Sequence, residues 1–526
     1  MKVSKIIGLC LAVALFLPVL AFSGGQRQPQ GGGAASSAAV NPTGFPIVNE
    51  PLTLTVFGSR DQNQAKWSEM FFFREYEKLS NIRLDLQEVP AQGFVERKNL
   101  LFASNELPDI FLRAGLSREE ISMYGSGSKQ LMVLEPQLQR WAPNFQKLLQ
   151  GDESIRQMLT AADGHIYTLP EIDISDTGRM DFKQWINKEW LAKLGLKVPT
   201  TPQEFKDVLI AFRNADPAGN GNTIPLGIRE PSSVYVLGGP WGLDYQMRDT
   251  INIENGKIHY WLTDANFREY LVYLNDLYKE KLIWQTYYRE GNRPEWRSNL
   301  SNAYYGAFYM PYSDVFVNVE NQFIGYPPLK GPRGDQFWAD SFPVIPTLGA
   351  FALSSTCKNP EAALRWVDYF YTDEGALFYR YGKEGETFYY DSKRMPRIND
   401  NILNSPEGFM TALGKINLVP GKGGPNLTTN LTDGIVASDL TKEVAAELAK
   451  YLRPSVSKPS VSEVDQERIN AILQDLIRYR DESVTKFIIG EWGFDRWDEY
   501  SRTLERIGLR DLEAIYQKAY DASRGR

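Results

Sequence analysis

Two segments near the start of the chain alternate apolar and polar residues, as half-buried strands do. Residues 52–57 (LTLTVF) and 82–89 (IRLDLQEV) place apolar side chains at every second position, which predicts two strands. Residues 65–80 and 94–104 have helical spacing, and 109–112 reads as a short buried strand. Strands that alternate with helices indicate βαβ units around a mostly parallel sheet.

The same alternation of strands and helices continues along the chain. A helix is expected to begin at Thr201, whose capping box has Pro202 at the first helical position and Glu204 at the third. Further strands are predicted at 163–170, 183–187, 304–310 and 350–353, and further helices at 188–194, 267–279, 360–371 and from 466 onward. Because 526 residues are too many for one hydrophobic core, two or three domains or lobes are expected.

The first 44 residues read as an export signal followed by a tether. Residues 1–23 have Lys2 and Lys5 before an apolar run, as a secretory signal peptide does. An uncleaved membrane anchor is the alternative, although the run is short for a bilayer. Cys10 comes too early for lipid attachment, and residues 24–44 form a flexible Gly/Ala/Ser/Gln tether. We therefore predict a periplasmic or secreted protein.

Composition removes several classes of function. The chain has 58 Lys and Arg against 65 Asp and Glu, a formal net charge of −7, and no basic block, which argues against nucleic-acid binding. His165, His259, Cys10 and Cys357 are its only histidines and cysteines, so most metal and Ser-His-Asp chemistry is excluded. No catalytic residue, metal or cofactor is predicted. With 27 Phe, 27 Tyr and 12 Trp, aromatic rings are expected to fill a core and to line a site for a flat, partly apolar ligand.

Several stretches, in matching order, resemble one family. These are NELPDIFL (105–112), DGHIYTLP (163–170), INKEWLAKLGLKVPTTPQEFKDVLIAF (186–212), KNPEAALRWVDYFYTDEGALFYRYGKEGETF (358–388) and the C-terminal residues 486–521. Together they resemble the extracellular solute-binding proteins of ABC importers, specifically the large, lipoprotein-type members of sugar- and oligosaccharide-binding family 1.

The resemblance implies an α/β fold of the type II periplasmic-binding-protein kind, with two lobes. Each lobe would be a mostly parallel sheet flanked by helices, and hinge strands would join the two. On this basis the first lobe is expected to comprise residues 45–172 and 313–390, and the second residues 173–312 and 391–526. The resemblance further implies a monomer that carries a carbohydrate, expected to be an oligosaccharide, to the transmembrane subunits of an ABC permease.

Candidate ligand-binding residues follow from the rule that ligands lie beyond the carboxyl ends of strands in open α/β sheets. Sugars also bind aromatic faces together with a few hydrogen-bonding groups. Polar or aromatic residues just past strand ends, or in a Gly/Pro-broken stretch, are Arg60, Asp61, Arg113, Asp173, Tyr235, Trp241, Tyr309 and Tyr312. The alternative for the two arginines is ion pairing or solvation, and for the aromatics it is packing.

The other candidates favour structural roles. Asp216, Asn220 and Asn222 resemble part of a calcium loop, but Ala218 stands at a ligand position and the expected acidic pair is missing. A plain turn is therefore favoured there. His165, His259 and Cys357 are interpreted as structural, and the cluster of Trp492, Trp497 and Tyr500 as helix packing.

Two other functions stay open from the sequence alone. An exported glycoside-processing enzyme would need two carboxyl groups at a set separation, for which Asp61 and Asp173 are candidates. A sensor or peptide-binding protein on the same fold is the third possibility.

Overall fold

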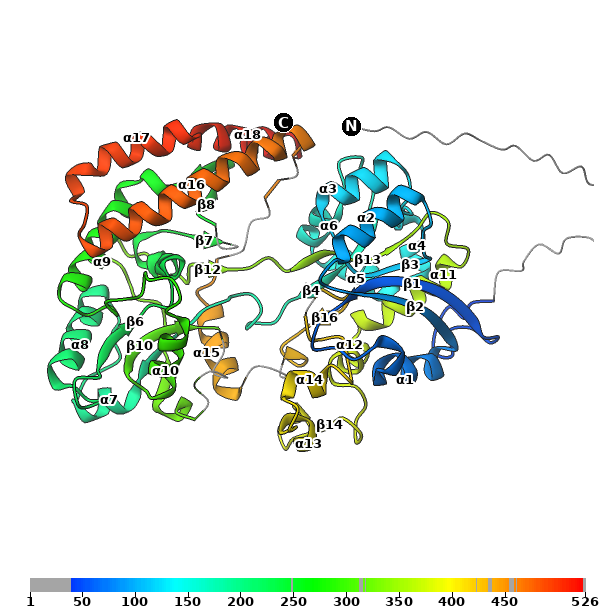
Figure 1. The fold of residues 1–526 in the computed structure, drawn as a ribbon, viewed down its shortest axis with the longest axis horizontal. Coiled ribbons are helices and arrows are strands. Elements are labelled where there is room, and N and C mark those ends of the chain that lie inside the picture. The colour runs from blue at the N-terminus through cyan, green and yellow to red at the C-terminus, as the bar shows by residue number, and fades with distance from the viewer. Residues whose placement is uncertain are drawn as a thin grey trace, which may run out of the picture. The chain divides into compact units, whose positions relative to one another are not determined.

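The computed structural model describes residues 39–246, 249–311, 316, 318–421, 423–433, 438–453, 458–459 and 461–523 (Figure 1). The expected signal peptide and residues 24–38 of the expected tether lie outside these ranges. The last part of the expected tether is held in place, because Arg365 donates hydrogen bonds to the carbonyl oxygens of Asn41 (3.2 Å) and Gly44 (2.9 Å). Among the described residues, no helix is long and apolar enough to cross a membrane.

The first lobe is built on a six-stranded sheet with the order β16-β4-β13-β3-β1-β2. Its strands are β1 (Leu52–Arg60), β2 (Ile82–Pro90), β3 (Ile110–Leu116), β4 (Thr168–Asp173), β13 (Thr347–Leu353) and β16 (Leu427–Thr428). β1 is parallel to β2 and β3, and β4 is parallel to β16. β13 is antiparallel to both β3 and β4, because it enters the sheet at the edge where those two strands end.

Helices cover this sheet and bury its apolar side chains. They are α1 (Phe71–Ser80), α2 (Phe94–Ser104), α3 (Arg118–Ile121), the π-helix η2 (Ser122–Gly127), α4 (Glu135–Trp141), α5 (Pro143–Gly151), α6 (Glu153–Leu159), α11 (Pro360–Asp368) and α12 (Asp373–Tyr381). In α1, Phe72, Phe73 and Tyr76 lie on one face and join the core. The short elements α13 (Asp400–Leu403), α14 (Phe409–Leu413), β14 (Phe388–Tyr390) and β15 (Pro396–Ile398) form a smaller cluster beside α12.

The second lobe has a four-stranded sheet with the order β11-β5-β10-β6. Its strands are β5 (Lys183–Asn187), β6 (Ile224–Gly227), β10 (Tyr305–Met310) and β11 (Phe323–Gly325), and its helices are α7 (Lys188–Lys193), α8 (Pro202–Ala215), α9 (Ala265–Lys279), α10 (Arg293–Ser301) and α15 (Asp439–Ala449). β10 is parallel to β6, but β5 is antiparallel to β10 and β11. This sheet is mixed rather than mostly parallel, because β5 enters it directly from the first lobe.

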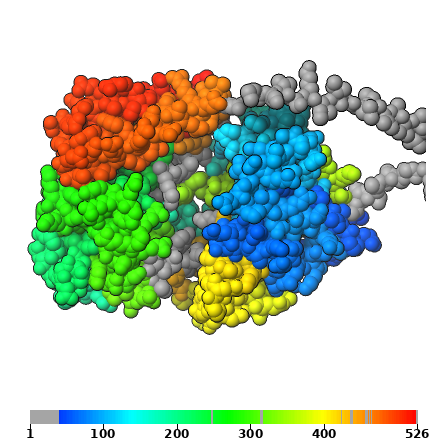
Figure 2. Space-filling model, in the orientation of Figure 1, coloured from blue at the N-terminus to red at the C-terminus, as the bar shows by residue number. Residues whose placement is uncertain are grey.

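Three C-terminal helices complete the second lobe: α16 (Glu463–Ile489), α17 (Trp497–Ile507) and α18 (Leu509–Ser523). They appear in Figure 2 as an orange-to-red layer over the green segments of this lobe. Tyr500 is fully buried, and Trp492 and Trp497 pack against the same core around Phe487. The helix-packing interpretation of this aromatic cluster is confirmed.

The chain changes lobes at different residues from those expected. β11 and the pair β7 (Tyr245–Gln246) and β12 (Asp340–Ser341) belong to the second lobe, although the expected first-lobe segment began at residue 313. β16 pairs with β4 in the first lobe, although the expected second-lobe segment began at 391. We therefore propose 39–173 and 347–433 for the first lobe and 183–341 and 438–523 for the second. Strands of two or three residues are too short to show an alternating pattern.

A histidine clamp fastens α18 to the hairpin of β8 (Ile251–Glu254) and β9 (Lys257–Tyr260). His259 Nε2 lies 2.9 Å from Asp264, and its Nδ1 lies 3.1 Å from Glu513 on α18. The hydrogen bond to Asp264, then that to Glu513, raises the pKa of His259 to about 9.

We expect the clamp to stabilise the protein below about pH 6.5 and to be lost as the pH rises through 9, since the folded-state pKa exceeds the unfolded value. The contribution should be below about 1 kcal/mol because the imidazole is partly exposed and screened. Urea unfolding of wild type and His259→Gln at pH 6.5 and 9.5 tests this. The stability difference between the two proteins should shrink at the higher pH, and an equal difference at both would contradict it.

Candidate functional site

The carboxyl ends of β1, β3 and β4 meet at one edge of the first-lobe sheet, as their parallel order requires. Arg60 is the last residue of β1, Asp61 follows it, and Asp173 is the last residue of β4. Arg113 lies within β3, where its φ of 55° breaks the regular strand. The Arg60 guanidinium donates a hydrogen bond to the carbonyl oxygen of Gln64 (3.0 Å).

Arg113 holds the chain itself at this edge. The residue is only 6 % exposed. Its guanidinium donates hydrogen bonds to the carbonyl oxygens of Ser59 (3.2 Å), Leu418 and Pro420 (3.2 Å). The amide of Gln64 donates to the same two carbonyls of Leu418 (3.3 Å) and Pro420 (2.9 Å). This guanidinium therefore fixes the segment that crosses the strand ends.

The two predicted carboxylates also make local hydrogen bonds. Asp61 accepts from the backbone N–H (2.8 Å) and side-chain amide (3.0 Å) of Asn63. Asp173 accepts from the backbone N–H (3.0 Å) and hydroxyl (2.6 Å) of Ser175. Each carboxylate thus stabilises the turn that follows its own strand.

A buried acid that sequence reasoning missed lies at the crossing between lobes. Burial first, and then the nearby carboxylate of Asp173, raise the pKa of Asp433 to about 6. Arg380 donates to the Thr432 carbonyl (2.8 Å) and to the Thr428 hydroxyl (3.1 Å) beside it. Charged groups therefore gather where the chain leaves the first sheet.

The predicted aromatic residues of the second lobe are buried in its core. The Tyr235 hydroxyl donates to Asp481 (3.0 Å), and Tyr309 stacks on Trp338 at 6.1 Å. Trp241 is 6 % exposed, and it and Tyr309 face a cavity of only about 20 Å³, which has room for one water. This burial favours packing over ligand contact. Tyr312 lies outside the described residues.

Replacing Trp241 with phenylalanine is expected to lower the free energy of unfolding by about 1.5 kcal/mol, without changing ligand affinity. The indole packs against Tyr270 and Tyr273 at 4.8 Å between ring centroids, and the smaller ring would leave part of that space empty. Urea unfolding and calorimetric titration of the variant test the two halves of this statement. A large loss of affinity with unchanged stability would return Trp241 to the binding site.

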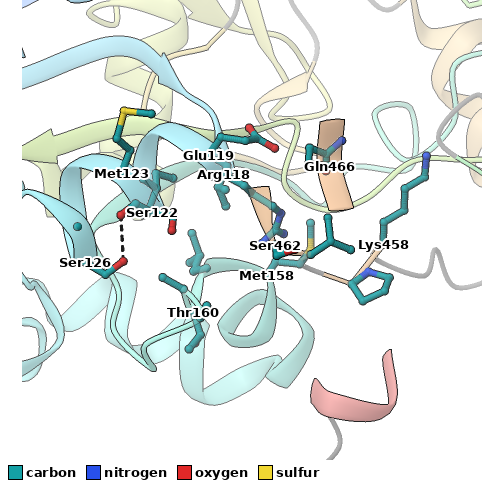
Figure 3. Close-up of a pocket in the computed structure, with 18 of the residues that line it drawn as sticks. Arg118, Glu119, Ser122, Met123, Ser126, Met158, Thr160, Lys458, Ser462 and Gln466 are labelled. Carbon is teal, nitrogen blue, oxygen red and sulfur yellow. Dashed lines mark hydrogen bonds between the residues drawn. The ribbon is translucent and has the colours of Figure 1, made fainter. Parts of the chain in front are cut away.

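A much larger cavity, of about 1120 Å³, opens at the same edge of the first-lobe sheet (Figure 3). Its first-lobe wall comes from α3 and η2, which follow the carboxyl end of β3, from the end of α6, and from Leu348 at the start of β13. The second-lobe wall comes from Lys458, Pro459, Val461, Ser462, Gln466, Leu473 and Tyr516. The volume lies just above the range of about 300–1,000 Å³ that is usual for small-molecule sites.

The first-lobe wall owes its shape to a local change of helix type. Ser117 starts α3 with a capping box, accepting from the N–H of Glu120 (3.2 Å) while the Glu120 carboxylate accepts from the N–H of Ser117 (2.9 Å). The helix then widens into η2, in which the Ser126 hydroxyl donates to the Ser122 carbonyl (2.9 Å). π-Helical turns are frequent at functional sites, and this one brings short polar side chains to the cavity.

The lining combines hydroxyl and amide groups with apolar surface. Its uncharged polar side chains are Ser122, Ser126, Ser128, Thr160, Ser462 and Gln466, and its larger apolar ones include Ile121, Met123, Met158, Leu159, Leu348, Val461, Leu473 and Tyr516. Figure 3 shows Ser122, Ser126 and Thr160 on the first-lobe side and Ser462 and Gln466 on the other. None of the seven predicted ligand-binding residues that the structure describes belongs to this lining.

The remaining candidates take part in local structure. The Asp216 carboxylate accepts from the N–H groups of Gly221 (2.8 Å) and Thr223 (3.2 Å) and so closes its own turn. His165 pairs with Glu135, and Cys357 is buried. No group of three or more His, Cys, Asp or Glu side chains suited to a metal occurs in the described part of the chain.

Two α/β lobes joined by several chain crossings, with a large cavity between them, define a solute-binding protein. The chain belongs to the bacterial extracellular solute-binding protein family, whose model matches residues 61–377. It is 25 % identical, over 91 % of its own length and 91 % of the relative's, to the fructooligosaccharide ABC transporter substrate-binding protein FusA of Streptococcus pneumoniae serotype 4. The family and this relative are binding proteins rather than enzymes.

Solved structures share the fold. A human-milk-oligosaccharide (HMO)-binding, ABC-transporter-associated protein from Bifidobacterium longum infantis superposes with a TM-score of 0.73 at 22 % identity, covering 90 % of this chain and 99 % of that one. FusA in complex with kestose has a TM-score of 0.69 at 24 % identity, with the same coverage. The two-lobed α/β fold class expected from the sequence is confirmed.

Proposed function

We propose that this protein captures an oligosaccharide in the cavity between its lobes and delivers it to the transmembrane subunits of an ABC importer, acting as an exported monomer. The observation that carries the proposal is the 1120 Å³ cavity with walls from both lobes. Hydroxyl and amide groups there suit sugar hydroxyls, and the apolar surface suits the C–H faces of sugar rings.

The relatives support the same class of solute. FusA is named for fructooligosaccharides, and a further relative, YtcQ of Bacillus subtilis, 21 % identical over 475 residues, is named for polygalacturonan and rhamnogalacturonan. Both names describe carbohydrates longer than a monosaccharide. The large cavity of the present chain has room for a solute of that size.

Release and capture require the lobes to move, and the crossings supply a hinge. At the crossings, the N–H of Asp173 donates to Val344 (2.8 Å), and the N–H of Ile174 donates to Thr428 (2.9 Å). The chain at Asp173–Ile174 and the chain at Val344 therefore lie side by side next to β16, and these two described connections can bend together, as in hinge closure around a ligand.

An exported glycoside-processing enzyme is the alternative. Its candidate carboxylates, Asp61 and Asp173, are both held by the turns that follow their strands, and neither lines the large cavity. Incubation with a labelled oligosaccharide separates the two functions, because a binding protein returns the sugar intact.

Thermal unfolding in the presence of saccharides tests the proposal. The panel holds glucose, fructose and fructo-, malto-, xylo- and galacto-oligosaccharides. A ligand at 100 times its dissociation constant stabilises the folded state by about 2.7 kcal/mol. For a chain of this size, that stabilisation should raise the midpoint of thermal unfolding by about 3 °C. We expect a shift with at least one oligosaccharide, recovered unchanged. No shift with any saccharide would contradict the proposal.

A further inference from the structure

The charges around the large cavity are compensated by the protein itself. Of the lining residues that the structure describes, Arg118, Glu119 and Lys458 carry formal charges. Lys458 forms an ion pair with Asp249, and Arg118 is followed in the lining by the acidic Glu119. The charges that remain available in the lining determine whether the cavity favours charged or neutral sugars.

Lys458 is paired away from the cavity. Its ammonium forms an ion pair with Asp249, which is buried and is not part of the lining. The same ammonium lies 5.8 Å from the ring centre of Tyr516. Figure 3 shows the Lys458 side chain extending away from Ser122 and Ser126. The positive charge is therefore used within the second lobe.

Arg118 is compensated on the opposite wall. Burial lowers the pKa of the Arg118 guanidinium, and the carboxylate of Glu119, the next residue of α3, partly offsets this effect. Both side chains line the cavity. A carboxylate brought in by a ligand would meet Glu119 as well as Arg118, and so gain little net attraction.

From this compensation we propose that the cavity selects neutral oligosaccharides and discriminates against sugars that carry a carboxylate, such as uronates. The inference rests on the proposed function. An ionised carboxylate that loses its water needs a cation of its own, and an unpaired one is strongly disfavoured. A neutral sugar needs only the hydroxyl and amide groups that the walls present.

The sharpest test compares one sugar with its own acid. A neutral oligosaccharide from the panel that binds is oxidised at its primary hydroxyl groups to the corresponding uronate, and calorimetric titration gives both affinities. We expect the uronate to bind at least about tenfold more weakly. An equal or higher affinity for the uronate would overturn the inference while leaving carbohydrate binding intact.

A variant in which Lys458 loses its acidic partner should bind the uronate more tightly than wild type does. Asp249→Asn removes the partner of Lys458, so affinity for the uronate should rise about tenfold relative to wild type, with little change for the neutral sugar. Asp276→Asn, which breaks the exposed pair with Lys206, is the matched control and should change neither affinity. A folded Asp249→Asn protein with no gain for the uronate would overturn the inference. If neither sugar binds to wild type, the proposed function fails, and the inference fails with it.

Discussion

Replacing Arg113 with alanine is expected to lower the free energy of unfolding by about 4 kcal/mol. The substitution removes one buried cation and leaves the carbonyl oxygens of Ser59, Leu418 and Pro420 without its hydrogen bonds. Hydrogen bonds to charged groups contribute about 1.5–3 kcal/mol each, and the carbonyls of Leu418 and Pro420 would keep only the amide of Gln64 as a side-chain donor among the contacts described above. Arg113→Lys should recover little of the loss, because one ammonium cannot reproduce the planar fork of donors.

Urea unfolding measures this effect, with Arg83→Ala as the control. Arg83 is an exposed residue of β2, and its replacement should change stability by no more than about 0.5 kcal/mol. If Arg113→Ala were as stable as the control but bound oligosaccharide weakly, Arg113 would be a ligand-binding residue, as the sequence alone predicted.

Filling the large cavity from its first-lobe wall is expected to abolish binding. Ser122 is exposed in η2 and lines the cavity, so Ser122→Trp places an indole where the solute would lie. We expect a loss of affinity of at least about 100-fold, or about 2.7 kcal/mol, with stability within about 0.5 kcal/mol of wild type.

The control for this variant is Ser298→Trp. Ser298 is an exposed residue of α10 in the second lobe and does not line the cavity, so affinity should stay at the wild-type value. Calorimetric titration of both variants decides the matter. Full affinity in Ser122→Trp would place the binding site elsewhere on the molecule.

Local pattern predicted most of the elements but not all of their ends. The alternation at 52–57 and 82–89 marks the longer strands β1 and β2, and the capping box at Thr201 marks the start of α8. The helix expected at 65–80 begins only at Phe71, after a 3-10 turn. Parallel or antiparallel pairing of β5 and β13 depends on where the chain crosses between lobes, which local spacing does not encode.

The lining of the proposed binding cavity was predicted less well than the fold, for a physical reason. The strand-end rule led to Arg60, Asp61, Arg113 and Asp173, which do lie at that edge, but their charges are occupied by backbone groups and neighbouring side chains. The cavity is lined instead by small hydroxyl residues on helices and by a wall from residues distant in sequence. The stretch SMYGSGS at 122–128, rich in Ser and Gly, is a local signal that the sequence analysis did not use.

The family resemblance, by contrast, predicted what periodicity did not. It implied a two-lobed solute-binding protein, and the family model and the fold of the solved structures agree. It carried no information about which side chains meet the solute, because a shared fold does not determine the side chains of a binding site.

The most direct test of solute capture between the lobes is hydrogen–deuterium exchange of the protein with and without a saturating oligosaccharide from the panel. Both walls of the cavity should slow together, so residues 118–128 of the first lobe and 461–473 of the second are expected to gain protection in the bound state. Protection confined to one lobe, or to residues outside the cavity, would contradict the account.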